Sequence, residues 1–370
     1  MRLNRYSPWI ALTVIAMVGC SGGNETTGGS GGGGAAATGE APVFSLAWSE
    51  YPSWSIFGVA HEMDLVDGDE GKLGEIERKW GVDIVLQEAP YDGCLNMFAS
   101  NNCDAVCITN MDALIVSPNR DAVAVLPTST SNGADACITT GINNLEELKP
   151  HKVFGLEGTV SQYCFVRCIE EIEKKEQKGY RAEDFDFSNQ DPGAAAVAMS
   201  QKQKTHHAIM VWNPFVLQTL KDRSDAKVLF DSSMIPGEIV DMVVVGRDVL
   251  KKPDADKFVQ AIIDVFYRMN QELANPETGD QALVALGEKF SRLSLEDMKI
   301  VVQQTQFYKT ADEAIELMEG EAFKVTMETV KAFCVKQGLV TSPQYTFGPD
   351  AKARLSFDAS YLKAWKENGS

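Results

Sequence analysis

Carboxylates and aromatic side chains gather in a few short stretches of this sequence, where a bound cation could use them. Five stretches carry them: Ala47-Trp48-Ser49, Thr109-Asn110-Met111-Asp112-Ala113-Leu114, Ser131-Asn132-Gly133-Ala134-Asp135, Val211-Trp212-Asn213-Pro214 and Ile235-Pro236-Gly237-Glu238-Ile239-Val240-Asp241. None of the five contains lysine or arginine. A planar cation is held by carboxylates through paired hydrogen bonds and by an aromatic face through a cation–π contact. An anion would instead need an arginine fork or a bare helix N-terminus, so the stretches favour a cationic ligand.

The predicted ligand-binding residues lie within or close beside these stretches. They are Ser49, Glu50, Tyr51, Trp54, Asn110, Asp112, Asp135, Trp212, Glu238 and Asp241. We expect Trp54 and Trp212 to contact the ligand with their rings and the carboxylates to accept hydrogen bonds from its N–H groups. Three residues have a structural alternative: Asp112 as a charge that only stabilises a helix start, Asp135 as a turn residue, and Trp54 as core packing.

No catalytic or metal-binding motif is found in the sequence. His61 begins His-Glu-Met-Asp-Leu, which lacks the second histidine of a zinc protease helix. His206 and His207 are adjacent and precede a predicted strand, so they should point to opposite faces. Outside the glycine-rich N-terminal stretch 19–34, neither a Gly-x-Ser-x-Gly elbow nor a phosphate-binding glycine loop occurs. We therefore predict a binding protein with no catalytic residues, no metal and no cofactor.

The N-terminal residues predict export followed by anchoring to a membrane. Two arginines precede an apolar run from Trp9 to Val18, which is about half of the ~20 residues that a membrane span needs. The run therefore predicts a secretory signal. It ends in Met17-Val18-Gly19-Cys20, which resembles a bacterial lipobox with Cys20 as the lipidated residue; the alternative is ordinary cleavage beside an incidental cysteine. The Gly/Ser-rich tract that follows is typical of a flexible tether, with the lipid as the only membrane contact.

The remainder of the chain alternates predicted strands and helices. Predicted strands are 43–48, 83–86, 104–108, 122–126, 152–155, 185–187, 208–211, 227–230 and 239–245. Helices are predicted in the charged stretch 70–79 and at 93–99, 111–116, 160–175, 193–201 and 214–220, and almost continuously after Asp254. Such alternation implies α/β lobes built on parallel sheets. Ligands of this architecture lie at the carboxyl ends of strands or in the crevice between lobes.

The length of 370 residues suits two lobes, and the charge excludes one class of partner. The predicted division is a signal peptide at 1–19, a tether at 20–41, lobe 1 at 42–131 and 236–370, and lobe 2 at 132–235. Lys+Arg is 34 and Asp+Glu is 52, which gives a net charge of −18. Binding to nucleic acid needs clustered positive charge, so we expect no nucleic-acid partner.

Eight cysteines are present, and seven remain if Cys20 is lipidated, so at least one of them is unpaired. Cys103 and Cys107 lie four residues apart at or beside a predicted strand, which separates them by roughly 13 Å. Cys164 and Cys168 lie four apart on a predicted helix, with Cβ atoms ~5–6 Å from each other. Neither pair suits a disulfide. Buried free cysteine is the leading interpretation.

Taken in order, the five stretches resemble those of extracytoplasmic solute-binding proteins of ABC importers, of the nitrate/sulfonate/taurine/thiamine-precursor type. More narrowly, they are similar to the binding proteins encoded beside urea carboxylase genes. The resemblance covers about residue 43 to about residue 300, and the many cysteines depart from what the family leads us to expect. It implies a type II periplasmic binding protein fold with two α/β lobes, two hinge crossings and a helical C-terminal tail. It also implies closure on a small solute and delivery to a membrane permease and its ATPase.

The resemblance points to urea-like or guanidine-like solutes, and the carboxylates favour guanidinium because neutral urea cannot compensate several buried charges. Urea or another amide or amine is the alternative. A second hypothesis is a cofactor-consuming pyrimidine-synthase-like enzyme on the same fold, but no phosphate cradle is found and the signal peptide argues against a cytosolic cofactor enzyme. A third is a surface receptor that presents its ligand to a sensor. We expect a periplasmic, lipid-anchored monomer that is not an enzyme.

Overall fold

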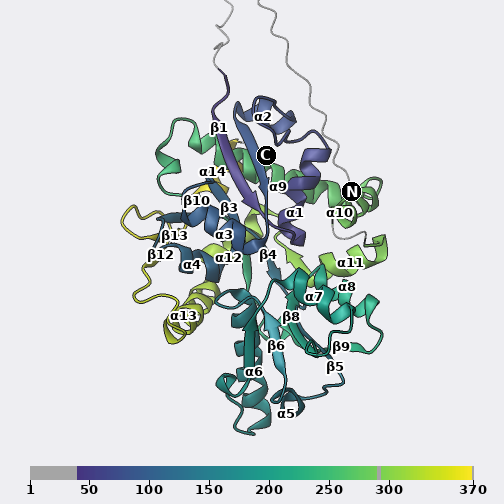
Figure 1. The fold of residues 1–370 in the computed structure, drawn as a ribbon. Coiled ribbons are helices and arrows are strands. Elements are labelled where there is room, and N and C mark those ends of the chain that lie inside the picture. The colour runs from purple at the N-terminus through teal and green to yellow at the C-terminus, as the bar shows by residue number, and fades with distance from the viewer. Residues whose placement is uncertain (1–39, 290–292, 369–370) are drawn as a thin grey trace, which may run out of the picture. The chain divides into compact units, whose positions relative to one another are not determined.

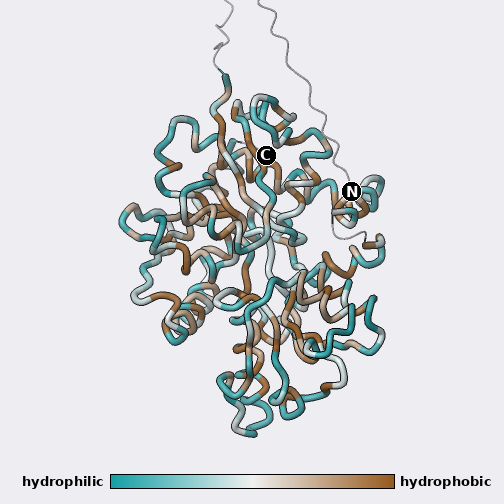
Figure 2. The backbone as a smooth tube through the Cα atoms, viewed as in Figure 1, coloured by the Kyte–Doolittle hydropathy of each residue, from teal (hydrophilic) through white to brown (hydrophobic). Residues whose placement is uncertain are grey.

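The computed structural model describes residues 40–289 and 293–368, which fold around two β-sheets (Figure 1). The predicted signal peptide, Cys20 and nearly all of the predicted tether lie outside the described residues. Apolar residues follow the strands and the inner helix faces, while the outer loops are mostly hydrophilic (Figure 2). None of the described helices is both long enough and apolar enough to cross a membrane.

Eight of the described strands form the first sheet, in the order β12-β13-β4-β10-β3-β1-β2, with β11 paired to β4. They are β1 (Val43–Trp48), β2 (Asp83–Glu88), β3 (Ala105–Thr109), β4 (Ala122–Ser131), β10 (Val240–Gly246), β11 (Thr305–Phe307), β12 (Tyr345–Phe347) and β13 (Leu355–Phe357). β10 runs antiparallel to both β3 and β4, and all seven of its residues are buried. A central strand covered on both faces needs an almost continuous apolar run, which the sequence of β10 supplies.

The second sheet has five strands among the described residues, in the order β7-β6-β8-β5-β9. They are β5 (Asp135–Thr140), β6 (Lys152–Gly155), β7 (Asp186–Asn189), β8 (Ala208–Trp212) and β9 (Ala226–Asp231). β6 is parallel to β7 and β8, while β5 is antiparallel to β8 and β9. A compact apolar group from β5, β8 and the helix that precedes β8 forms part of the core of this half.

Helices connect and cover the strands of both sheets (Figure 1). Before β10 in the sequence they are α1 (Pro52–Glu62), α2 (Glu75–Trp80), α3 (Tyr91–Ala99), α4 (Asn110–Val116), α5 (Leu145–Leu148), α6 (Val160–Glu176), α7 (Pro192–Ser200) and α8 (Phe215–Asp222). After β10 they are α9 (Ala255–Ala274), α10 (Gly279–Lys289), α11 (Leu295–Gln304), α12 (Ala311–Glu319), α13 (Glu321–Lys336) and α14 (Ser360–Asn368). Short 3₁₀ turns lie at Ala182–Asp184, Ser232–Met234 and Val249–Lys251.

The chain crosses between the two sheets where β4 leads to β5 and where β9 leads to β10. The two crossings are bonded to each other, because the Ser131 and Ser232 hydroxyls lie 2.7 Å apart and the Gly133 N–H donates to the Ser232 hydroxyl at 2.8 Å. Gly133 has a φ of +97°, a backbone conformation that glycine adopts without strain. Side-chain hydroxyls therefore tie the two connections into one junction.

A third segment braces this junction from the C-terminal part of the chain. Gln304, the last residue of α11, accepts a hydrogen bond from the Asn132 N–H with its carbonyl oxygen at 2.8 Å. Its side-chain oxygen accepts another from the Asn213 amide at 2.7 Å. One glutamine thus contacts the first crossing and the end of β8 together.

The structure departs from the sequence-based expectation in its strand directions and in two segments. Both sheets are mixed rather than parallel, because the crossing strands β5 and β10 enter antiparallel to their neighbours; the sequence analysis did not predict β5 at all. In the charged stretch, helix α2 begins only at Glu75, since the preceding loop donates backbone N–H groups of Asp67 and Gly74 to the Glu77 carboxylate. The C-terminal tail is not purely helical, and its three short strands extend the first sheet.

The seven cysteines in the described residues are all buried free thiols. The Sγ atoms of Cys164 and Cys168 lie 4.0 Å apart on α6. A disulfide has an S–S distance of about 2.05 Å, so this pair is in contact without being bonded. Within the described ranges, no group of three or more histidine, cysteine or acidic side chains is placed to hold a metal ion.

Candidate ligand-binding site

A small cavity lies at the junction, where strand ends of both sheets meet. Its lining residues are Tyr51, Trp54, Tyr91, Thr109, Asp135, Val160, Trp212, Ile239 and Asp241. Its volume is about 10 Å³, which is roughly the space of one water molecule. We call it the inner cavity, and a solute of several heavy atoms enters it only when the walls move apart.

Backbone pairing fixes the polar walls of the inner cavity. Asp135 is the first residue of β5 and pairs with Trp212, the last residue of β8. Asp241 is the second residue of β10 and pairs with Thr109, the last residue of β3. Each carboxylate is therefore carried on a central strand, beside another strand end, so its position is set by ladder hydrogen bonds.

Aromatic rings form the other walls, and they contact one another in sequence. The centroids of Tyr51 and Trp54 are 4.8 Å apart, and the Trp54 and Tyr91 rings stack at 5.6 Å with an interplanar angle of 3°. Tyr91 meets Trp212 edge-on at 5.6 Å and 70°. Tyr51 precedes Pro52, which opens α1 as its first residue, so this helix presents Tyr51 and Trp54 one turn apart. The rings join both sheets around one space.

Asp241 is the more deeply buried carboxyl group of the pair. The Ser129 hydroxyl donates a hydrogen bond to it, and Ser129 is itself bonded to Ser53. Burial raises the pKa of Asp241 well above its usual range, and the charge of Asp135 adds to the increase. Burial therefore favours the protonated form of Asp241.

Asp135 is the carboxyl group that carries charge in the inner cavity. The Ser131 hydroxyl donates to its Oδ2 at 2.6 Å, and burial raises the pKa of Asp135 to about 6. It is consequently mostly ionised at neutral pH. Among the described lining residues there is no lysine and no arginine, so this wall carries about one negative charge without an internal partner.

Asp112 lies behind the cavity wall and holds the Tyr91 ring in place. The Tyr91 hydroxyl donates to Asp112 Oδ2 at 2.6 Å, and the Thr109 hydroxyl donates to the same oxygen at 2.8 Å. Burial raises the pKa of Asp112 to about 6, against the lowering effect of these hydrogen bonds. The Thr109 side chain also caps α4 by accepting from the Asp112 N–H. Asp112 therefore positions a wall residue, and the helix-start alternative also has support.

Asn110 and Glu238 fasten the second crossing and do not line the inner cavity. The Asn110 amide donates to the Glu238 carbonyl oxygen at 3.1 Å and accepts from the Val240 N–H at 3.1 Å. The Glu238 carboxylate accepts from the Tyr163 hydroxyl at 2.6 Å and from Arg167 at 2.9 and 2.8 Å. The structure therefore engages Glu238 with an internal cation on α6, where the sequence analysis assigned it to the ligand.

Ser49 and Glu50 line a neighbouring, more open hollow, which we call the vestibule. Its lining residues are Ser49, Glu50, Glu88, Ala89, Pro90, Tyr91, Asp191, Trp212 and Phe215, and its volume is about 510 Å³. Tyr91 and Trp212 belong to both hollows, so these two rings separate the vestibule from the inner cavity. Burial and then the charge of Glu88 raise the pKa of Glu50 to about 7.

Five predicted site residues thus line the inner cavity: Tyr51, Trp54, Asp135, Trp212 and Asp241. Sequence reasoning missed Tyr91, whose ring lines both the inner cavity and the vestibule. A signal for it existed, because Tyr91 follows the predicted strand that begins at Asp83, and ligands gather at the carboxyl ends of such strands. Val160 and Ile239 are apolar and gave no such signal.

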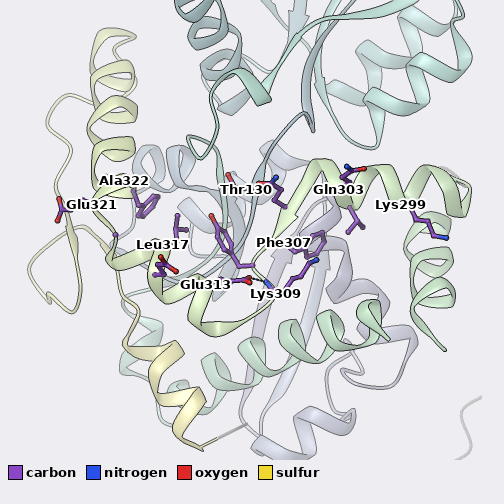
Figure 3. A pocket seen from close by; sticks show the side chains of 15 residues that line it. Thr130, Lys299, Gln303, Phe307, Lys309, Glu313, Leu317, Glu321 and Ala322 are labelled. Atoms are coloured by element: carbon purple, nitrogen blue, oxygen red, sulfur yellow. Dashed lines mark hydrogen bonds between the residues drawn. The ribbon is translucent and has the colours of Figure 1, made fainter. Parts of the chain in front are cut away.

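A larger hollow lies elsewhere in the described residues, among α11, β11, α12 and α13 (Figure 3). Its volume is about 950 Å³, and both Lys309 and Glu313 lie on its wall. The Glu313 carboxylate accepts from the Lys309 N–H at 2.7 Å, as part of the cap of α12. Its lining carries charges of both signs, and no strand end of the second sheet reaches it.

Comparison with known proteins gives the fold but not the ligand. No protein-family profile and no curated protein matches the chain. Its structure is similar to the alkanesulfonate-binding protein SsuA from Xanthomonas axonopodis pv. citri bound to MOPS, with a TM-score of 0.63 and 13% identity over 82% of this chain and 96% of that one. It is also similar to a zinc-bound ligand-binding component of an ABC-type import system from Staphylococcus aureus, with a TM-score of 0.61 and 14% identity over 87% and 98% of the two chains.

A third similar structure is a Candida albicans gene product described as having the generic periplasmic binding protein fold, with a TM-score of 0.58 and 13% identity over 88% and 95% of the two chains. The described residues therefore have the fold of a periplasmic binding protein, and the predicted class of two α/β lobes is confirmed. The ligands named for the first two structures differ in charge and kind, so the fold leaves the solute of this chain to be argued from its own cavity.

Proposed function

We propose that this protein is the extracytoplasmic solute-binding component of an ABC importer and that it captures a small planar cation, guanidinium in the first place, by closing its two lobes. One observation carries the proposal: the inner cavity places Asp135 and Asp241 among four aromatic rings, with no lysine or arginine among the described lining residues. Carboxylates and aromatic faces are the groups that a planar cation binds.

The charge of the cavity supports a monovalent cation. Asp135 is mostly ionised at neutral pH, while burial favours the protonated form of Asp241. A buried charge without a partner is costly. One guanidinium would neutralise Asp135 and donate further N–H groups to the Asp241 carboxyl.

The same walls argue against an anionic solute. The similar Xanthomonas protein is named for binding alkanesulfonates. A sulfonate in this inner cavity would face Asp135 at close range and would find no arginine or lysine among the described lining residues. The chain therefore has the same fold as a sulfonate-binding protein, while its inner cavity carries the negative charge of Asp135.

The size of guanidinium limits its affinity. Its four heavy atoms, at a ceiling near −1.5 kcal/mol per atom, give about −6 kcal/mol. That free energy corresponds to a Kd of tens of micromolar. A cation of this size therefore reaches useful affinity only with nearly complete burial.

Urea is the second candidate, and a specific observation favours it. The indole N–H groups of Trp54 and Trp212 are buried and have no hydrogen-bond partner among the described residues. The urea oxygen could accept from such donors, whereas guanidinium has no acceptor. Urea ranks second because it would leave the Asp135 charge uncompensated.

The cellular setting follows from the N-terminal sequence and the fold together. In this proposal Cys20 carries the lipid that holds the protein in the cell envelope, and a permease with its ATPase receives the solute from the closed monomer. The protein is not an enzyme, and the inner cavity offers no lysine for an imine with pyridoxal phosphate. A receptor that presents the same ligand to a sensor would use the same site.

A thermal-shift panel tests the proposal directly. The purified protein is heated with guanidinium, methylguanidine, urea, taurine, nitrate or hydroxymethylpyrimidine at matched ionic strength. A ligand that binds only the folded state adds about 2.7 kcal/mol of stability at a concentration of about 100 Kd. We expect guanidinium to raise the Tm by several degrees and taurine and nitrate to leave it unchanged. A shift with taurine or nitrate alone would sink the cationic assignment.

A further inference from the structure

The vestibule repeats the chemistry of the inner cavity on the other side of Tyr91 and Trp212. Three carboxylates line it, from Glu50, Glu88 and Asp191, together with the ring of Phe215. No lysine or arginine occurs among its described lining residues. Two acidic, ring-walled compartments therefore lie next to each other and share one aromatic partition.

Separate parts of the fold bring these carboxylates together. Glu50 follows β1, and Glu88 ends β2 opposite Trp48 in the parallel ladder. Asp191 comes from the second sheet's side as the N-cap of α7, where one of its oxygens accepts from the Ala194 N–H at 2.9 Å. The two glutamates are close enough for the charge of Glu88 to raise the pKa of Glu50. The fold therefore brings three carboxylates into the lining of one hollow.

Ser49 gives an independent sign that the vestibule takes a ligand. Its side chain lines the vestibule and is only 3% exposed, yet its hydroxyl has no hydrogen-bond partner among the residues that the structure describes. Buried hydroxyl groups are normally bonded, and this one can accept a hydrogen bond from an ammonium group. The side chain thus adds an uncharged acceptor to the three carboxylates.

We propose that the physiological ligand is an elongated organic dication, with a guanidinium or ammonium head in the inner cavity and a second cationic head in the vestibule. The linker between the heads passes Tyr91 and Trp212, whose rings contact each other edge-on at 5.6 Å and must move apart to admit it. The second head is held by Glu50 and Glu88, with Ser49 accepting a further N–H. This inference rests on the proposed function, because the first head occupies the inner cavity.

The second head also answers the affinity limit of a four-atom cation. Each additional hydrogen bond to a charged group, made in a site already walled by rings, strengthens binding without a new loss of overall freedom. We therefore expect a dication to bind roughly ten to a hundred times more tightly than a monocation of equal length.

Calorimetry with two matched probes tests the inference. The probes are 4-aminobutylguanidine, which carries a cation at each end, and pentylguanidine, in which a methyl group replaces the ammonium. The measured quantity is the Kd of pentylguanidine divided by the Kd of 4-aminobutylguanidine, at fixed ionic strength. It is determined for the unmodified protein, for Glu88→Gln, and for the control Glu146→Gln. Glu146 lies on α5 and pairs with Lys149, so its substitution removes one negative charge away from the vestibule.

The inference expects a ratio of about ten or more in the unmodified protein, a ratio near one in Glu88→Gln, and the full ratio in Glu146→Gln. Equal Kd values for the two probes in a protein that binds guanidinium would overturn the dication and leave the proposed function standing. A dication preference that survives Glu88→Gln places the second head elsewhere and also overturns the inference. If neither guanidinium nor either probe binds, the proposed function itself is wrong.

Discussion

Two groups of carboxylates lie at the crossings of the chain, a half-buried one at Glu238 and a buried one at Asp135 and Asp241. Glu238 has its cation within the protein, since Arg167 forms two hydrogen bonds to it from α6 and Tyr163 donates a third. Asp135 and Asp241 have only hydroxyl donors, and no lysine or arginine lines their cavity among the described residues. The first cluster is complete without a ligand, whereas the second lacks the positive charge that would complete it.

This difference shows why residue type alone does not mark a binding site. All three carboxylates belong to strand ends or crossings, and all three have aromatic neighbours. What separates them is a single arginine that lies 71 residues away in sequence from Glu238. A buried carboxylate with an internal cation has a structural role, and one without it is available to a cationic solute.

The largest effect is expected from removing the cation of the complete cluster. Arg167→Met leaves Glu238 largely buried without its partner, and this should lower the free energy of unfolding by about 3–5 kcal/mol. The side chains of Arg167 and Glu238 are only 10% and 18% exposed. Urea denaturation followed by circular dichroism measures the change.

A surface ion pair provides the control for that prediction. Arg181→Met removes the partner of Asp184 at a side chain that is 72% exposed, and it should cost less than about 1 kcal/mol. Adding Glu238→Gln to Arg167→Met should restore part of the loss, because it removes the unpaired charge. Equal effects of Arg167→Met and Arg181→Met would contradict the distinction between the two clusters.

For Asp135, which has no internal cation, removing the charge is expected to raise the free energy of unfolding instead of lowering it. The folded pKa of Asp135 is about 6 against 3.8 for the free group, so its contribution to stability is greatest at low pH and is lost as pH rises through about 6. At neutral pH, Asp135→Asn should therefore raise the unfolding free energy of the unliganded protein by about 2–3 kcal/mol. The same variant should abolish guanidinium binding, as measured by calorimetry.

The exposed Asp186→Asn serves as the matched control, with little effect on stability or binding. If Asp135→Asn destabilised the protein and still bound guanidinium, Asp135 would be a structural turn residue, as the alternative in the sequence analysis has it.

The pH dependence of affinity sharpens the same comparison. Below a pH of about 6, guanidinium must displace the proton of Asp135, so its Kd should rise toward tenfold for each pH unit. Burial raises the pKa of both Asp241 and Tyr51, which favours their protonated forms. Urea affinity should not weaken in this way on acidification. Calorimetry between about pH 5 and about pH 8 distinguishes the two solutes.

Asp112 titrates in the same range, so the experiment is repeated in Asp112→Asn. Because Asp112 lies behind Tyr91, this variant should keep the pH dependence while weakening affinity modestly. A pH dependence that disappears in Asp112→Asn would move the charge from Asp135 to Asp112.

The smallest effect is expected from the aromatic wall. Trp212→Leu keeps an apolar wall but removes the ring face, and a buried cation–π contact contributes about 1–2 kcal/mol. The Kd for guanidinium should therefore rise roughly five- to thirtyfold. Phe215→Leu is the control, since Phe215 contacts Trp212 but lines only the vestibule. Equal losses in both variants would show that general packing is responsible.

The sequence predicted most strands because buried strands are short apolar runs bounded by turn residues, as in β1, β6 and β10. It could not predict that β10 enters antiparallel between β3 and β4, since direction depends on where a crossing returns the chain. Asp135 and Trp212 were recognised individually, but their pairing is set by register between β5 and β8. Likewise, no local pattern in Ile235–Asp241 predicts that Glu238 pairs with Arg167 on α6.

The burial of the native thiols has a practical consequence for observing lobe closure. Burial raises the pKa of the Cys94, Cys103 and Cys334 thiols to about 12. All seven described cysteines are buried. Maleimide reagents react with exposed thiolates. In a chain that begins at Glu40, a fluorophore on one engineered surface cysteine in each lobe would therefore report their separation during a titration, with the seven buried cysteines left in place.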